Sequence, residues 1–224
     1  MTVSSTTDSN LIIYNIFDMD GLLIDSEPLW LKAQQTTLQE LYGLNLSKQD
    51  LHPFQGVASR SFCQSMSKKY PSHSINEAIL LDTLIIKMQA CIEQAHLLPG
   101  AKELLKWLQR QSRPIAIASS SPLSLINKVI EKYDLTVDVI ASGEEVSRSK
   151  PHPMIFELAA QRLGAQPEQC RIWEDSIAGV IAAKAAGMQV VAIPAASHPH
   201  IQQFTIADFY FGSLHESQFL IEST

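Results

Sequence analysis

Two aspartates one residue apart follow the first apolar stretch of the chain. The run from Leu11 to Phe17 predicts a buried strand, and Asp18 and Asp20 come directly after it. Alternate side chains of extended backbone point the same way, so both carboxylates can face one spot at the strand's end. Gly21 permits a sharp departure of the backbone there. Two carboxylates with no cation nearby in sequence suit a divalent metal site or acid–base chemistry. The alternative is a surface turn.

A run of serines follows a later apolar strand. Ser119, Ser120 and Ser121 come after residues 114–118, and Pro122 favours the start of a helix directly behind them. The N-terminus of a helix offers free N–H groups and a partial positive charge, which suit a phosphate group. Simple helix capping by these serines is the alternative.

A lysine and an acidic pair complete the set of polar strand ends. Lys150 precedes Pro151, which restricts the lysine to extended backbone and fixes its position. Glu174 and Asp175 follow the apolar residues 170–173 and could complete an oxygen shell for Mg²⁺. Taken singly, the lysine could be a surface charge and Asp175 an ordinary helix-start acid. Together the four segments supply a carboxylate nucleophile, a second carboxylate, hydroxyl and amide donors, a cation and a metal site. That combination suits phosphoryl transfer.

Two patterns of predicted elements position these groups. Residues 29–96 have helical periodicity throughout, with helices over 28–42 and 59–70. Ser26 is expected to cap the first helix, and a capping box from Ser74 to Glu77 is expected to open a long helix to about residue 95. From residue 101 on, helices (101–111, 122–133, 153–163 and 176–186) alternate with strands (114–119, 137–141, 170–173 and 189–193), and 208–211 is a candidate edge strand. This alternation predicts a parallel α/β sheet, whose ligands bind beyond the carboxyl ends of the strands.

Composition sets bounds on the class of protein. The chain has 224 residues, of which 46% are hydrophobic and 18% charged, and a formal net charge of -6. Nothing in this balance indicates nucleic acid or an anionic membrane surface as a partner, and no run approaches the ~20 apolar residues of a membrane span. Cys63, Cys91 and Cys170 are far apart, which suits free thiols in a reducing cytosol. The first ten residues do not read as a signal peptide.

The four motifs, taken in order, resemble those of the haloacid dehalogenase superfamily of phosphotransferases. They are Asp18-Met-Asp20-Gly21, Ser119, Lys150-Pro151 and Glu174-Asp175, and the resemblance runs from about Ile12 to Leu214. The segment DMDGLLIDSEPLW is similar to the β-phosphoglucomutase branch, and especially to bacterial 2-deoxyglucose-6-phosphate and hexitol phosphate phosphatases. The resemblance implies an α/β, Rossmann-like parallel sheet core, made of residues 10–28 and 97–224, with an inserted helical cap domain over residues 29–96.

The resemblance also implies roles for the site residues. Asp18 would attack phosphorus, and Asp20 would act as general acid and then as general base. Ser119, the Ser120 amide and Lys150 would hold the phosphoryl oxygens. Mg²⁺ would be held by a set of oxygen ligands: Asp18, the Asp20 main-chain carbonyl and Asp175, with Glu174 as a further candidate ligand. The substrate implied is a small phosphorylated sugar or polyol; which one, and the oligomeric state, do not follow from the sequence.

Four other functions are alternatives to this one. A phosphonate hydrolase needs a cap lysine that forms a Schiff base with substrate, and no cap lysine (Lys48, Lys68, Lys69 or Lys87) has a distinguishing context. The other three are a mutase, a dehalogenase and a silent binding protein. A sugar phosphate mutase is the first, but such enzymes typically place a histidine where Trp30 stands, and Arg60 is the one nearby cation for a second phosphate. A dehalogenase is disfavoured because its chemistry does not need Asp20. A catalytically silent phosphate-binding protein would have no need to keep the acid pair.

Overall fold

The computed structural model describes residues 12–54, 57–195 and 201–217. Within these ranges six parallel strands form one sheet, in the order β3-β2-β1-β4-β5-β6. They are β1 (Tyr14–Phe17), β2 (Ile115–Ser119), β3 (Val139–Ser142), β4 (Cys170–Glu174), β5 (Gln189–Ala192) and β6 (Phe209–Tyr210). The predicted parallel α/β sheet is therefore confirmed. Leu11, the predicted start of the first strand, lies outside the described residues.

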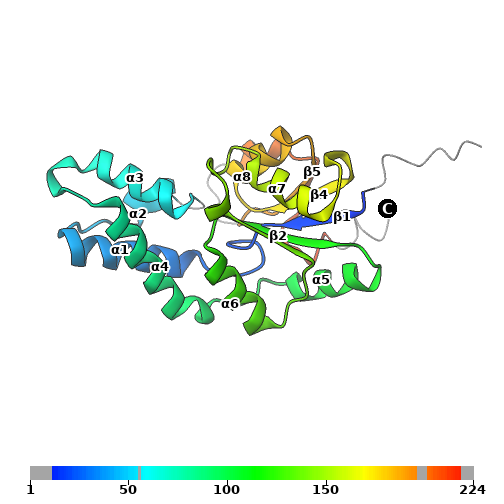
Figure 1. Ribbon diagram of the computed structural model, residues 1–224, viewed down its shortest axis with the longest axis horizontal. Helices are drawn as coiled ribbons and strands as arrows, with labels where there is room; N and C mark the ends of the chain where they lie inside the picture. The colour runs from blue at the N-terminus through cyan, green and yellow to red at the C-terminus, as the bar shows by residue number, and fades with distance from the viewer. Residues whose placement is uncertain (1–11, 55–56, 196–200, 218–224) are drawn as a thin grey trace, which may run out of the picture.

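Helices cover both faces of this sheet (Figure 1). The helices α5 (Ala101–Arg110) and α6 (Leu123–Tyr133) lie on one face, and α7 (Met154–Leu163) and α8 (Ile177–Ala185) lie on the other. In β2, Ile115 and Ile117 belong to the buried cluster that contains α5 and α6, whereas Ala116 and Ala118, which alternate with them, belong to the cluster that contains α7 and α8. Burial on both faces explains why the strands are apolar almost throughout.

Four further helices gather to one side of the sheet (Figure 1): α1 (Glu27–Tyr42), α2 (Lys48–Leu51), α3 (Ser59–Lys69) and α4 (Glu77–Cys91). The helix α1 ends at Gly43, whose φ of 66° is left-handed and whose amide donates to the Gln39 and Leu38 carbonyls. Residues 29–96 contain no strand in their described part, which agrees with the predicted helical periodicity. That they form a separate cap domain stays a prediction.

Both capping predictions are wrong. Ser26 precedes α1 but makes no capping hydrogen bond, because its hydroxyl donates to Asp20 instead. Ser74 has a left-handed backbone and caps nothing in α4. Asn76 caps that helix, since its side-chain oxygen accepts from the amides of Ala78 and Ile79. The residue directly before the first helical turn therefore takes the role that the sequence pattern assigns two positions earlier.

Strand order and register bring the polar strand ends together. The strand β1 lies between β2 and β4, with Phe17 paired to Ile117 on one side and to Trp173 on the other. The rings of Phe17 and Trp173 stack with centroids 5.4 Å apart. Asn15, a polar residue inside the first strand, accepts a hydrogen bond of 3.1 Å from the Trp173 indole, which accounts for its burial. The carboxyl ends of the three central strands therefore meet at one edge. Among the described residues, no helix combines the length and apolarity needed to cross a bilayer.

Candidate active site

Lys150 lies between two carboxylates at this edge of the sheet. Its ammonium nitrogen is 2.6 Å from Asp18 Oδ1 and 2.8 Å from Glu174 Oε2, and only 4% of the lysine side chain is exposed. The ring of Phe156, in α7, lies 4.8 Å from the same nitrogen. A buried charge without partners would be very costly, so the lysine and its two carboxylates form one unit.

The site carries more negative than positive charge, and the pKa values reflect this. Burial raises the pKa of Asp18 to about 8, from an ordinary 3.8; Lys150 opposes the rise, and the neighbouring Glu174 and Asp20 add to it. Burial likewise raises the pKa of Asp175, and the charges of Glu174 and Asp18 add to that rise. Burial alone would lower the pKa of Lys150, but its two carboxylate partners outweigh burial and raise it. The lysine therefore stays charged while the carboxylates compete for protons.

Glu174 is fixed by the start of helix α8. Its Oε1 accepts from the amide (3.1 Å) and the hydroxyl (2.6 Å) of Ser176, while its Oε2 accepts from Lys150. The Ser176 hydroxyl in turn accepts from the Gly179 amide, so it caps the helix. The positive end of the helix favours a carboxylate at this place. Glu174 thus holds Lys150 in position with both of its oxygens engaged.

Gly179 leaves room for that carboxylate. A Cβ at this position would lie 2.0 Å from Glu174 Cδ and within 2.3 Å of both carboxylate oxygens. We expect Gly179→Ala to lower the rate of the catalysed reaction by about 10- to 100-fold, and to lower the free energy of unfolding by about 1–3 kcal/mol. Helix propensity alone would change stability in the opposite direction. Activity and thermal unfolding would measure both effects.

The control for this substitution is the Glu174→Ala background. Without the Glu174 carboxylate, Gly179→Ala meets no obstruction, so its effect on stability should largely vanish in the double variant. A Gly179→Ala protein as active and as stable as the wild type would show that Glu174 can move aside freely.

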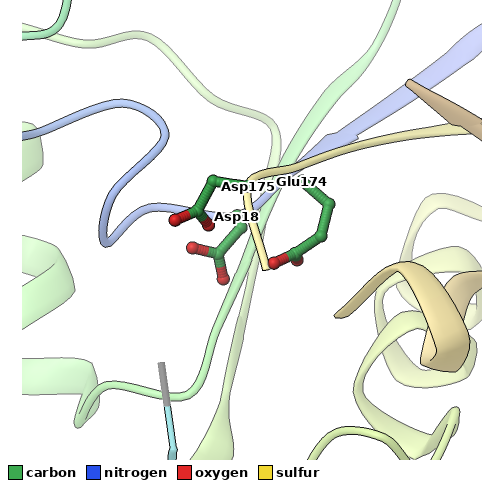
Figure 2. A group of neighbouring side chains, drawn as sticks. All are labelled: Asp18, Glu174 and Asp175. Carbon is green, nitrogen blue, oxygen red and sulfur yellow. The ribbon is translucent and has the colours of Figure 1, made fainter. Parts of the chain in front are cut away.

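Three carboxylates at this edge could hold a metal ion. Ligand oxygens of Asp18, Glu174 and Asp175 lie within 4.8 Å of one another, and Figure 2 shows them converging from the ends of β1 and β4. Asp175 accepts no hydrogen bond from the described residues, and its carboxylate packs against Gly21, where a Cβ would lie 2.2 Å from Asp175 Oδ2. Oxygen ligands with surplus negative charge suit Mg²⁺, a hard cation that also keeps water and phosphate oxygens as ligands. The residues present therefore fit the expected ion, with Asp18 and Asp175 the more available pair.

The Asp20 carboxylate accepts four hydrogen bonds. Its Oδ1 accepts from the Ser26 hydroxyl (2.6 Å) and from the Trp30 indole nitrogen (3.0 Å). Its Oδ2 accepts from the hydroxyls of Ser119 (3.0 Å) and Ser121 (2.7 Å). The structure thus places Asp20 where the chain leaves the sheet for helix α1 and beside the loop that follows β2.

The serine loop is rigidly built. The Ser121 amide donates to the Ser119 hydroxyl, and the Ser142 hydroxyl at the end of β3 donates to the Ser121 carbonyl. The main chain of Ser120 packs against Gly143, where a Cβ would lie 2.6 Å from the Ser120 carbonyl oxygen. Ser119 and Ser142 are fully buried. The loop is therefore held from two strands before any ligand binds.

A cavity of about 700 Å³ lies between this edge of the sheet and the helices α1 and α2. Asp20, Ser120 and Asp175 line its sheet side, and its helical side includes Trp30, Gln34, Lys48 and His52. A second cavity of about 580 Å³ is lined by Lys150 and Ser120, and by Arg60 from α3. Ser120 lines both cavities, so the charged cluster lies where they approach each other. The larger volume is typical of a site for a small molecule.

All seven residues expected from the sequence lie at this edge, while other contributors were missed. Ser121, Ser26 and Trp30 donate to Asp20, and Ser176 with Gly179 fixes Glu174. The serine at position 121 has a detectable signal, since in an extended run it points the same way as Ser119. The sequence carries no signal for the role of Gly179, because nothing in a helical segment shows which carboxylate packs against a given glycine.

Ligands of a parallel α/β sheet bind at its carboxyl edge, and the buried carboxylate–lysine cluster found there supplies the charged groups that hydrolytic and group-transfer enzymes use. The family model described as "Haloacid dehalogenase-like hydrolase" matches residues 15–193. The chain therefore belongs to the haloacid dehalogenase-like hydrolases, and the family expected from its four motifs is confirmed.

Named relatives agree with this membership. Hexitol phosphatase B from Escherichia coli K12 is 34% identical over 209 residues, covering 92% of this chain and 94% of the relative. Fructose-1-phosphate phosphatase YqaB from the same strain is 30% identical over 178 residues, with 79% and 93% covered. The structure of β-phosphoglucomutase from Clostridium difficile is similar with a TM-score of 0.81 at 21% identity, covering 95% and 96%, which supports the fold.

Proposed function

We propose that this chain is a Mg²⁺-dependent phosphatase that hydrolyses sugar or hexitol phosphate monoesters through an aspartyl-phosphate on Asp18. The observation that carries the proposal is the cluster itself: Asp18 next to Lys150 and Asp175, with Asp20 two residues along the chain beside a cavity of about 700 Å³. The named phosphatase relatives act on hexitol phosphates and fructose 1-phosphate, and we extend that substrate class to this chain.

Asp18 is the nucleophile in this proposal. Lys150 binds its Oδ1, which leaves Oδ2 to attack the phosphorus atom. As the new O–P bond forms, the ester P–O bond breaks and its electron pair goes to the sugar oxygen. Asp20 gives that oxygen a proton. A water molecule then attacks phosphorus, loses its proton to Asp20 and releases phosphate from Asp18.

The remaining residues bind and orient. Ser119, the Ser120 amide and Lys150 hold the phosphoryl oxygens, and Glu174 holds the lysine. Asp18, Asp175 and the Asp20 carbonyl would hold Mg²⁺, with Glu174 a further candidate. When bound, the ion would neutralise charge on the phosphoryl oxygens. We further propose that residues 29–96 act as a cap whose side chains line the sugar side of the cavity.

The test is inorganic phosphate release from a panel of substrates, in Mg²⁺ and in EDTA. The panel contains sorbitol 6-phosphate, 2-deoxyglucose 6-phosphate, mannose 6-phosphate, fructose 1-phosphate and β-glucose 1-phosphate. We expect release that EDTA abolishes. Mg²⁺ at a hundredfold excess over its Kd should also stabilise the folded protein by about 2.7 kcal/mol, visible as a higher Tm without any substrate.

Other outcomes would identify the alternatives. Glucose 6-phosphate appearing from β-glucose 1-phosphate without phosphate release would indicate a mutase and overturn the proposal. A Tm shift with Mg²⁺ but no turnover of any panel member would indicate a phosphate-binding protein without catalysis.

A further inference from the structure

The Asp20 carboxylate is fully occupied by protein donors in this structure. A carboxylate offers about four lone-pair positions, two on each oxygen. Ser26 and Trp30 take those of Oδ1, and Ser119 and Ser121 take those of Oδ2. No lone pair is left to bind the proton that Asp20 would exchange with the substrate. One of the four hydrogen bonds must therefore break before Asp20 can act.

The four donors divide by element as well as by oxygen. Ser26 directly precedes α1 and Trp30 lies in its first turn, whereas Ser119 ends β2 and Ser121 belongs to the loop behind it. Oδ1 is therefore held from the helical side of the cavity and Oδ2 from the sheet side. The two oxygens therefore have donors from different elements, and they can have different roles in the reaction.

Ser119 is the donor that substrate would remove. Its hydroxyl carries one proton, which now goes to Asp20 Oδ2, and its oxygen already accepts from the Ser121 amide. If Ser119 donates to a phosphoryl oxygen, it cannot donate to Asp20 at the same time. Phosphate binding at Ser119 would thus free one lone pair of Oδ2.

Trp30 is suited to hold the other oxygen. An indole nitrogen is a donor only, so unlike a hydroxyl it cannot turn to accept from Asp20 or from the substrate. Its ring packs against the main apolar cluster and lines the larger cavity, which fixes the direction of the N–H group. Ser26 adds a second donor to the same oxygen, and it is fully buried.

Resting on the proposed phosphatase function, we propose that Trp30 is a positioning residue that anchors Oδ1 of Asp20. Oδ2, released by Ser119 on phosphate binding, takes up a proton from solvent and gives it to the sugar oxygen as the ester bond breaks. It then takes a proton from the attacking water and returns it to solvent when phosphate leaves. The arrangement makes proton transfer conditional on an occupied phosphate site. It also ties the acid–base group to the first turn of α1.

The test compares Trp30→Phe with the wild type on two leaving groups. Sorbitol 6-phosphate releases an alkoxide that needs a proton, whereas p-nitrophenyl phosphate releases a phenolate that does not. We expect the first turnover of sorbitol 6-phosphate to slow by about 10- to 100-fold with KM within about threefold. The first-turnover burst of p-nitrophenolate should keep its wild-type rate, because Asp20 acts on that substrate only in the second step. Equal losses on both substrates, or no loss on either, would overturn the positioning role.

Three controls separate this role from structural damage. Leu41→Ala lies on the same helix, is 40% exposed and does not line the cavity, so it should leave both rates unchanged. In an Asp20→Ala background, Trp30→Phe should add no further loss. If Trp30→Phe does not fold, Ser26→Ala removes the other donor to Oδ1 and should produce the same split between leaving groups. Failure of the proposed function is distinct from these results, since the wild type itself would then release no phosphate.

Discussion

Asp18→Asn is expected to reduce phosphate release by about 10⁴-fold or more, because an amide oxygen does not attack phosphorus as a carboxylate does. The loss should appear in kcat, since Lys150, Ser119 and the cavity that bind the substrate remain. The measurement is phosphate release from the best panel substrate at saturating concentration, with Mg²⁺ present. Wild-type enzyme quenched in acid during turnover should carry one added phosphoryl group, and the variant should carry none.

The thermal stability of metal-free Asp18→Asn should not fall with its activity. Burial and like-charged neighbours raise the pKa of Asp18 to about 8, so in the metal-free protein this carboxyl group stabilises the fold at low pH and loses that contribution as pH rises towards 8. A neutral amide avoids this, and Lys150 keeps Glu174 as a partner. The metal-free variant at pH 8 should therefore melt at or above the wild-type temperature.

The matched control is Asp82→Asn, an exposed aspartate on α4 outside both cavities, which should change neither activity nor Tm. Turnover above trace levels in a clean Asp18→Asn preparation would refute the assignment of the nucleophile.

Lys150→Met should impair both activity and stability. Removing the ammonium group takes away a proposed phosphoryl ligand, and we expect a loss of about 10²- to 10³-fold in kcat/KM. It also leaves the buried carboxylates of Asp18 and Glu174 without their cation, which should lower the free energy of unfolding by about 3–5 kcal/mol near pH 8. At pH 5 the loss should be smaller, because Asp18, whose pKa is raised to about 8, is then already neutral and only Glu174 loses its cation.

Lys184→Met provides the control for this substitution. Lys184 also pairs with an aspartate, Asp208, at 2.8 Å, but its side chain is 38% exposed. Removal of this surface pair should cost less than about 1 kcal/mol and leave activity unchanged. If Lys150→Met were as stable and active as Lys184→Met, the buried cluster would have neither the catalytic nor the structural role proposed for it.

Much of the fold follows from local sequence patterns. The alternation of helices and strands after residue 101 and the helical periodicity of residues 29–96 both recur in the structure. These patterns are reliable because a buried face imposes its period on every residue of an element. The capping predictions failed because no such period constrains the residues at the start of a helix. Several polar residues there can cap the helix, and tertiary contacts decide which of them does. The Ser26 hydroxyl donates to Asp20 and therefore does not cap the helix that it was expected to cap.

The sequence by itself determined the family, the parallel sheet and seven residues at the carboxyl edge, since six of those residues end or follow apolar strands and Lys150 stands before a proline in the loop that leads to a helix. Only the tertiary structure decided how they act on one another. Lys150 and Asp18 are 132 residues apart, and their contact depends on helix α7, which follows the lysine and packs against β2 and β1. The four donors to Asp20, and the Gly179 that makes room for Glu174, come from different elements. A hydrogen bond needs atoms within about 3 Å, and local sequence patterns do not set distances between residues far apart in the chain.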